Sequence, residues 1–438
     1  MDRRLFVLTA AGSAALVACG GGAGAEGSAG VGSVPTAQNR FVQENLAATS
    51  LDYKAKYTIP EMVDAWGIAI RPAGAGGHFW VGGGGSSWQF VGDVRNHATP
   101  AMRSITVDGL TRVSVPGTQD PVSGGVVTGV AYNGGPLASA NFVSSSTTDG
   151  LQDMPDGTGG TVTMEGSARF VFVTDTGYIS AWTDRRQDTG GILRNNGATR
   201  RVYDGTSAGA AFFGVAFKSD TWDAMWAVDF GSKPQILQFD GTWAVVPTVG
   251  MVNPFGTGLA GAVVPGDFVP FNITVLNNRV FVTYAKSRLG VSDITTFYAG
   301  EEDALDAVAE AKSGYQPNRG RLVEYRLDGS TVRVYADEKH LNAPWGVAIA
   351  PAAFGAFAGS VLVGNFGGAG LITAFNGVTG AFLGYLRGSD GGFVAVPGLW
   401  ALQFGNGVSL GDSDALYFAA GPEDEAAGLF GSLRYAPR

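Results

Sequence analysis

Three side chains in this sequence are placed where they could gather oxygen ligands for a divalent cation. Asp64, Asn272 and Asn342 each lie at or just before a short apolar strand. If these strands surround a common axis, their carboxylate and carboxamide oxygens project near it on one face, and such oxygens are the ligands that Ca²⁺ prefers. Asp229 and Asn365, which end the strands that follow, are expected at the same rim of the central channel or the neighbouring one.

These five side chains also have structural uses. Asp and Asn cap turns and accept hydrogen bonds from backbone N–H groups, so turn capping stands beside a structural cation and a catalytic cation as a third alternative. The sequence contains no phosphate-binding glycine loop and no zinc-protease pair. It therefore predicts no cofactor apart from Ca²⁺ at this one place.

The elements that must position these residues repeat along the chain. Six short apolar segments, each expected to form a strand, begin with similar sequence motifs; they lie at residues 66–70, 129–132, 213–217, 271–275, 345–349 and 399–404. Each is followed by further aromatic and β-branched runs bounded by Gly, Asn or Asp, which is typical of strands joined by tight turns. Radial repetition of such units predicts an all-β, six-bladed β-propeller over residues 40–438. The opening aromatic residues are expected at equivalent places, packed between neighbouring blades: Trp66, Phe213, Phe271, Trp345 and Trp400.

The two ends of the propeller predict how the ring closes. The last repeat is one strand short when the chain ends, whereas residues 40–46 precede the first repeat with no other strand to pair with. We therefore expect this N-terminal segment to supply the missing outer strand and to cover an open sheet edge. Two insertions interrupt the repeats, at 137–168 and 287–320, and the second carries a predicted helix from Ala304 to Lys312.

Composition narrows the choice of partners. Of the 438 residues, 15% are charged, 45% are hydrophobic and 68 are Gly, which is typical of a core-rich protein with many turns. The formal net charge of -9 leaves no basic stripe to neutralise phosphates, so we expect no nucleic-acid partner. We expect a monomer that meets a membrane only through a lipid anchor and that binds an unknown ligand or an envelope protein.

The N-terminal residues predict that anchor. Arg3 and Arg4 resemble a twin-arginine export signal, and the apolar stretch after them is too short to span a bilayer as a stable helix. The stretch ends in Leu-Val-Ala-Cys at Cys19, the only cysteine, and this resembles a bacterial lipobox. We therefore expect an export signal at 1–19, lipidation of Cys19 and a flexible linker at 20–39. The expected location is the periplasm or outer membrane, with the cell surface left open.

Several stretches carry a family resemblance: 270–273, 282–286, 341–346, 363–367, 380–384, 398–401 and 428–431. They resemble an uncharacterised family of secreted bacterial proteins related to NHL-repeat propellers, over roughly residues 40–435. The resemblance implies a six-bladed ring and export, but no reaction. The chain departs from the family pattern at Asp64–Ala65, at the glycine run 82–85 and at Ala427.

Three classes of function remain open at this point. The first is a non-catalytic propeller of the cell envelope that binds a ligand, a glycan or a protein. The second is a metal-assisted hydrolase or lyase at the central channel, since the gluconolactonase-like propellers are similar in holding a metal there that polarises water for lactone cleavage. The third is a purely structural envelope protein. The sequence does not decide whether the protein is an enzyme.

Overall fold

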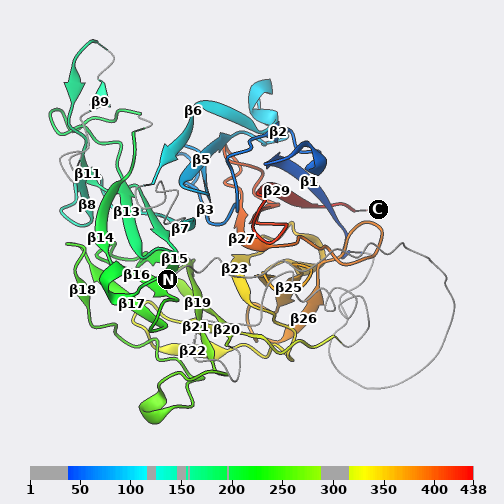
Figure 1. Ribbon diagram of the computed structural model, residues 1–438. Helices are drawn as coiled ribbons and strands as arrows, with labels where there is room; N and C mark the ends of the chain where they lie inside the picture. The colour runs from blue at the N-terminus through cyan, green and yellow to red at the C-terminus, as the bar shows by residue number, and fades with distance from the viewer. Residues whose placement is uncertain are drawn as a thin grey trace, which may run out of the picture. The chain divides into compact units, whose positions relative to one another are not determined.

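Six antiparallel β-sheets carry the fold (Figure 1). The computed structural model describes residues 38–115, 125–145, 154–155, 158–194, 197–287 and 315–437. Blade 1 contains β3 (Ile68–Ala69), β4 (Phe79–Gly83), β5 (Ser86–Val91) and β6 (Thr106–Ser114). Blade 2 contains β7 (Val127–Tyr132), β12 (Phe170–Thr174), β13 (Tyr178–Trp182) and β14 (Arg200–Asp204). Blade 3 contains β15 (Phe212–Phe217), β16 (Ala224–Asp229), β17 (Gln235–Asp240) and β18 (Val245–Val246).

The second half of the chain continues the same pattern. Blade 4 contains β19 (Phe268–Leu276), β20 (Arg279–Lys286), β21 (Gly320–Tyr325) and β22 (Thr331–Val334). Blade 5 contains β23 (Pro344–Ile349), β24 (Val361–Asn365), β25 (Ile372–Phe375) and β26 (Phe382–Tyr385). Blade 6 contains β27 (Leu399–Phe404), β28 (Ala415–Ala420) and β29 (Leu429–Tyr435), to which β1 (Phe41–Ala48) and β2 (Tyr57–Thr58) are added.

The first strands of the six blades form the inner wall of a ring. Each of β3, β7, β15, β19, β23 and β27 contacts the inner strand of the next blade, and β27 contacts β3 (Figure 1). The described residues carry short 3₁₀ helices between strands: η1 (Leu51–Tyr53), η2 (Pro100–Arg103), η4 (Thr206–Ala208), η5 (Leu259–Gly261) and η6 (Gly355–Phe357). The expected all-β, six-bladed propeller is confirmed.

The small residue that follows the opening position of an inner strand allows the strands to approach each other. A Cβ atom added at Gly67 would lie 2.7 Å from the backbone nitrogen of Val130 in the next blade, and one added at Gly346 would lie 2.4 Å from the carbonyl oxygen of Trp400. Contacts this short exclude any side chain. The glycine of the repeated sequence motif therefore allows the inner strands to pack tightly around the axis of the ring.

The N-terminal strand closes the ring as the sequence predicts. β1 pairs antiparallel with β29, from Phe41 opposite Tyr435 to Ala48 opposite Leu429, with a bulge between Asn45 and Ala47. β2 then adds to the far side of β1 as a parallel strand. The sixth blade is thus built from both ends of the described chain, and β29 is not left as an open edge.

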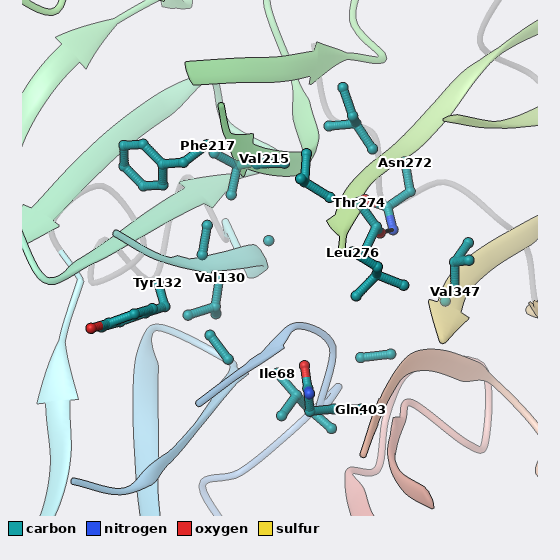
Figure 2. A pocket seen from close by; sticks show the side chains of 18 of the residues that line it. Ile68, Val130, Tyr132, Val215, Phe217, Asn272, Thr274, Leu276, Val347 and Gln403 are labelled. Atoms are coloured by element: carbon teal, nitrogen blue, oxygen red, sulfur yellow. Dashed lines mark hydrogen bonds between the residues drawn. The ribbon is translucent and has the colours of Figure 1, made fainter. Parts of the chain in front are cut away.

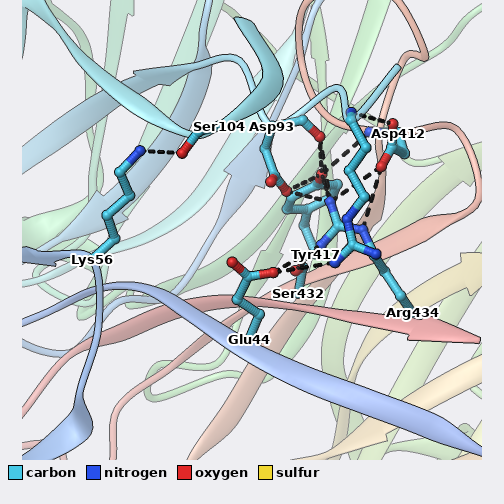
Figure 3. A network of polar contacts seen from close by, with 9 residues as sticks. Glu44, Lys56, Asp93, Ser104, Asp412, Tyr417, Ser432 and Arg434 are labelled. Atoms are coloured by element: carbon cyan, nitrogen blue, oxygen red, sulfur yellow. Dashed lines mark hydrogen bonds and ion pairs between the residues drawn. The ribbon is translucent and has the colours of Figure 1, made fainter. Parts of the chain in front are cut away.

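A buried polar network lies behind this closure (Figure 3). Arg434 on β29 forms an ion pair with Asp93, which belongs to the loop after β5 in blade 1. The Tyr417 hydroxyl on β28 donates to the same carboxylate at 2.6 Å, and Asp412 and Glu44 approach the guanidinium at 3.4 and 3.6 Å. Burial raises the pKa of Tyr417 well above its ordinary value, and the charge of Asp93 raises it further. The network joins blades 1 and 6 and β1.

The described residues of the first insertion form two small sheets. β8 (Val143–Ser145) pairs with β11 (Glu165–Ser167), and β9 (Met154–Pro155) pairs with β10 (Thr161–Val162). This insertion contacts blade 3, because the Trp243 indole donates to the carbonyl of Val143 at 2.9 Å. The predicted helix from Ala304 to Lys312, the export signal and Cys19 lie outside the described residues. No helix in the described part of the chain has the length and apolar character needed to cross a membrane.

Candidate functional site

A cavity of about 250 Å³ lies on the ring axis and receives residues from all six inner strands (Figure 2). Buried aliphatic side chains such as Ile68, Val215 and Val347 form much of its wall. The solvent exposure of the side chains rises toward the C-terminal end of an inner strand. In β19, Phe271 is fully buried, whereas Leu276 at the end of the strand is half-buried. The mouth therefore lies at the C-terminal ends of the inner strands.

The lining of this cavity is electrically neutral. Its polar side chains are Tyr132, Ser219, Asn272, Thr274 and Gln403, together with the indole groups of two tryptophans. No Asp, Glu, Lys, Arg or His belongs to the lining formed by the described residues. The site is thus suited to dispersion contacts and a few neutral hydrogen bonds, rather than to a charge that must leave water.

A cluster of aromatic rings closes the axis at the starts of the inner strands. Trp400 is fully buried and stacks between Trp66 and Phe366, with ring centroids 3.7 and 3.8 Å away. Trp66 also contacts Phe213 of blade 3 and Trp345 of blade 5, at 5.2 and 6.4 Å. We call Trp66, Phe213, Phe271, Trp345, Phe366 and Trp400 the aromatic plug.

The plug adds to one expectation from the sequence. The opening aromatic residues pack between neighbouring blades as expected, as in the contact of Trp66 with Trp400. Other contacts, such as that of Trp66 with Phe213, also join blades that are not adjacent. The Trp345 indole likewise donates across the ring to the carbonyl of Phe213 at 3.2 Å. The physical reason is that six inner strands leave a narrow axis, which large rings fill by meeting at the centre. Trp345 is the plug residue that also lines the cavity, so the plug adjoins the cavity floor there.

Of the predicted cation ligands, Asn272 is the one that lines the cavity. It stands where four other blades have glycine: Gly67, Gly129, Gly214 and Gly346. Its Nδ2 donates to the carbonyl of Trp345 at 2.8 Å, and a longer contact of 3.4 Å reaches the hydroxyl of Thr274. Asn272 therefore joins blades 4 and 5 and orients a neighbouring hydroxyl group.

Asp64 lies against the plug and is absent from the cavity lining. Its Oδ1 accepts a hydrogen bond of 3.0 Å from the Trp400 indole, and its backbone has a positive φ of 47°. Burial raises the pKa of this carboxyl well above its ordinary value, and the nearby charge of Glu425 raises it further. The Trp400 hydrogen bond acts in the opposite sense, and Asp175 adds a smaller rise.

Two of the other predicted residues, Asp229 and Asn365, hold the chain where it enters an inner strand. Asp229 Oδ1 accepts from the backbone N–H groups of Ala211 and Gly231 at 3.0 and 2.8 Å. Asn365 Oδ1 accepts from the backbone N–H of Asn342 at 2.8 Å. These bonds correspond to the turn-capping alternative. Asn342 Oδ1 is buried without a hydrogen-bond partner among the described residues.

The structure thus gives Asp64, Asn272 and Asn342 different partners. Within the described ranges, no three His, Cys, Asp or Glu side chains gather as a possible metal-binding group. The shared Ca²⁺ site stays a prediction, and Asp64 is the residue at which it is best tested because Asp64 brings the only formal charge of the three.

Replacement of Asp64 by Asn is expected to change the pH dependence of stability. A raised pKa in the folded state means that Asp64 contributes stability below its unfolded pKa, and that this contribution is lost as pH rises through the folded pKa. Asp64→Asn keeps an acceptor for Trp400 without the charge. Melting temperatures of the two proteins should therefore agree near pH 4, with the variant higher at neutral pH.

Calcium separates the two interpretations of Asp64. A bound cation would favour the ionised carboxylate, so added Ca²⁺ should raise the melting temperature of the wild type and leave Asp64→Asn unchanged. A wild type that does not respond to Ca²⁺ or to a chelator would remove the cation site and leave the buried acid. Parallel pH profiles of wild type and variant would contradict the raised pKa.

Sequence reasoning missed two cavity residues, Thr274 and Gln403. The signal was a departure from the repeat, because the equivalent position is alanine in the other four blades: Ala69, Ala131, Ala216 and Ala348. Comparing the copies position by position would have found both. Thr274 lies beside Asn272, while Gln403 comes from blade 6 on another part of the wall (Figure 2).

Comparisons with known proteins leave the family of the chain open. No family model matches it. One relative, an uncharacterised protein of Acanthamoeba polyphaga mimivirus, is 25% identical over 89% of this chain and 79% of its own length. A second uncharacterised protein of the same virus is 30% identical over 39% of each chain. These viral relatives do not support the secreted bacterial family that the sequence resembles.

Two solved structures are also similar to the chain. The WD40 domain of Neurospora crassa Pan2 has a TM-score of 0.39 and 10% identity, and the match covers 90% of this chain and 96% of that domain. The β-propeller domain of Cps50 (Swd1) from Myceliophthora thermophila has a TM-score of 0.36 and 9% identity, with 84% and 96% covered. The description of this chain as a six-bladed β-propeller rests on its own strand pairing.

Proposed function

We propose that this protein is a binding propeller that holds a small ligand in its axial cavity. The observation that supports the proposal is the convergence of all six inner strands on one neutral cavity with an aromatic floor. A mostly apolar, preformed concavity with a few convergent polar groups is the usual form of a small-molecule site. The ligand enters from the side of Leu276 and Gln403, because the plug closes the other side.

Binding is favoured over turnover by the side chains within reach of such a ligand. General acid–base catalysis needs a titratable group near neutral pH, and covalent catalysis needs an activated nucleophile. The hydroxyl groups of the described lining, on Tyr132, Ser219 and Thr274, have no His, Lys or carboxylate beside them in the cavity wall. The lining supplies contacts and orientation for a ligand.

A cavity-filling variant tests this proposal. Thr274→Phe places a ring inside the cavity, so it should abolish binding of small apolar compounds, with at least about a tenfold loss of affinity for a loss of 1.4 kcal/mol. Ligand-observed NMR titration measures the dissociation constant. Thr331→Phe, on the exposed outer strand β22, is the matched control and should bind as the wild type does. Equal binding by both variants would place the ligand elsewhere or nowhere.

We also propose that a lipid anchor at Cys19 holds the propeller at a bacterial envelope membrane. The support is the Arg3–Arg4 pair, the short apolar stretch and the lipobox-like ending at Cys19. The Gly-rich linker that follows is composed as a flexible tether, which leaves the ring free to meet a ligand or an envelope protein.

Substitution of Cys19 by Ser should abolish lipidation. In a bacterium that processes lipoproteins, wild-type protein should incorporate a labelled fatty acid and sediment with membranes, whereas Cys19→Ser should do neither. A single acyl chain binds membranes only marginally, so a stable membrane fraction also reports more than one chain. Wild-type protein recovered at full length in the cytoplasm, with an uncut N-terminus, would overturn the anchor.

A further inference from the structure

We infer that the axial cavity selects a small, uncharged, mainly apolar molecule that carries one hydrogen-bond acceptor, such as an aromatic or aliphatic alcohol. This inference rests on the proposed function, because it names the ligand class of the same site. It draws on three observations about the cavity: its charge, its size and the two places where the repeat gives way to polar residues.

Charge is the first selector. A charged ligand in this cavity would lose its hydration without meeting an opposite charge, since every described lining side chain is neutral. An unpaired charge in a low-dielectric site is strongly disfavoured. A carboxylate or ammonium ion of the same shape as a neutral ligand is therefore rejected. The overall charge of -9 does not alter this, because the acidic residues lie outside the lining.

Size is the second selector. A volume of about 250 Å³ falls below the range of roughly 300 to 1,000 Å³ typical of sites for drug-sized ligands. The aromatic plug prevents the ligand from passing along the axis, because Trp66 and Trp400 stack at 3.7 Å. The ligand is thus a single ring or a short chain.

The third selector is the hydroxyl group of Thr274. Its oxygen already accepts the longer contact from Asn272, whose Nδ2 is held by the carbonyl of Trp345. This contact leaves the O–H of Thr274 as a donor toward the ligand. Gln403 offers the complement, because its Nε2 donates to the carbonyl of Phe404 at 2.9 Å and its Oε1 is left to accept. A hydroxyl group can accept from Thr274 or donate to Gln403.

These two residues stand out because of the repeat itself. Four inner strands place alanine at this position, and three of these alanines line the cavity without adding a polar group: Ala69, Ala131 and Ala216. Blades 4 and 6 place the polar residues Thr274 and Gln403 there instead (Figure 2). A buried or half-buried polar group that is not needed for packing is most useful when a ligand satisfies it.

The inference is tested with four compounds built on the same ring: benzyl alcohol, toluene, benzoate and benzylamine at neutral pH. Dissociation constants are measured by ligand-observed NMR on the wild type, Thr274→Val and the cavity-filled Thr274→Phe. Benzyl alcohol should bind about three- to tenfold more tightly than toluene, since one neutral hydrogen bond distinguishes them. The two charged compounds should bind at least about 100-fold more weakly than the alcohol.

Thr274→Val isolates the hydrogen bond because it removes the hydroxyl and preserves the shape. In this variant benzyl alcohol should fall to the affinity of toluene, while toluene keeps its own. If benzoate or benzylamine bound as tightly as the alcohol and lost affinity in Thr274→Phe, the ligand class would be wrong and the site would stand. If the compounds that bind did so equally to wild type and Thr274→Phe, the cavity itself would be rejected. Failure of all four to bind the wild type would overturn the inference.

Discussion

Deletion of residues 38–48 is expected to abolish the cooperative thermal unfolding transition of the propeller. The deletion removes β1, which pairs with β29 along its length and buries Phe41 and Leu46 to 2% and 1% exposure. Burial of each such side chain contributes about 1.5 to 3 kcal/mol, and a whole domain is stable by only about 5 to 15 kcal/mol. The loss of two anchors, a strand ladder and the contact of Glu44 with Arg434 should exceed what the ring can tolerate.

The matched control is a protein that begins at Gln38, which keeps β1 and should melt as the full chain does. Calorimetry or circular dichroism measures both transitions. The protein that lacks residues 38–48 should also aggregate, because β29 then exposes an unpaired edge. A melting temperature unaffected by the loss of β1 would show that closure by this strand is not needed for stability.

Substitution of Trp400 by Ala is expected to destabilise the protein by about 3 to 5 kcal/mol, the usual cost of truncating a buried aromatic residue. Trp400 is fully buried at the centre of the plug, stacked on Trp66 and Phe366, and its indole donates to Asp64. The substitution leaves a cavity among the rings of Trp66, Phe271, Trp345 and Phe366. Denaturant unfolding measures the change in free energy.

Trp400→Phe separates the two contributions of this residue. It retains a ring in the stack and removes the hydrogen bond to Asp64, so it should cost less than the alanine substitution. Trp243→Ala provides a control outside the plug, because Trp243 is partly buried under the first insertion. If Trp400→Ala were no more damaging than Trp243→Ala, the plug would not be a main source of stability.

The fold could be predicted from the sequence because the pattern that specifies it is local and repeated. The glycine after the opening position, as in Gly67 and Gly346, recurs wherever a neighbouring inner strand approaches too closely for a side chain. The closing strand followed from counting, because one repeat lacked a strand and residues 40–46 had no partner. Neither inference needed any knowledge of distant contacts.

The site was less predictable because it depends on which residues meet across the ring. Asp64 and Trp400 are 336 positions apart, and the indole that reaches the carboxyl could not be chosen from the tryptophans by sequence alone. The same holds for Arg434 and Asp93, which pair across the junction of the first and last blades. Thr274 and Gln403 could have been found in the sequence, since each stands where the other repeats have alanine. That they line the cavity, however, is shown only by the structure.

Closure by β1 also affects how the protein can fold during its synthesis on the ribosome. The first described strand must wait for the last one, so a nascent chain carries an unmatched β1 through synthesis of nearly the whole ring. Residues 429–435 are synthesised after the strands of the other five blades, so the sixth blade cannot be completed before those strands exist. A chain cut short by a stalled ribosome would lack β29 and would leave β1 unpaired. Unpaired strand edges promote aggregation, so we expect such incomplete chains to be bound by chaperones or degraded by proteases.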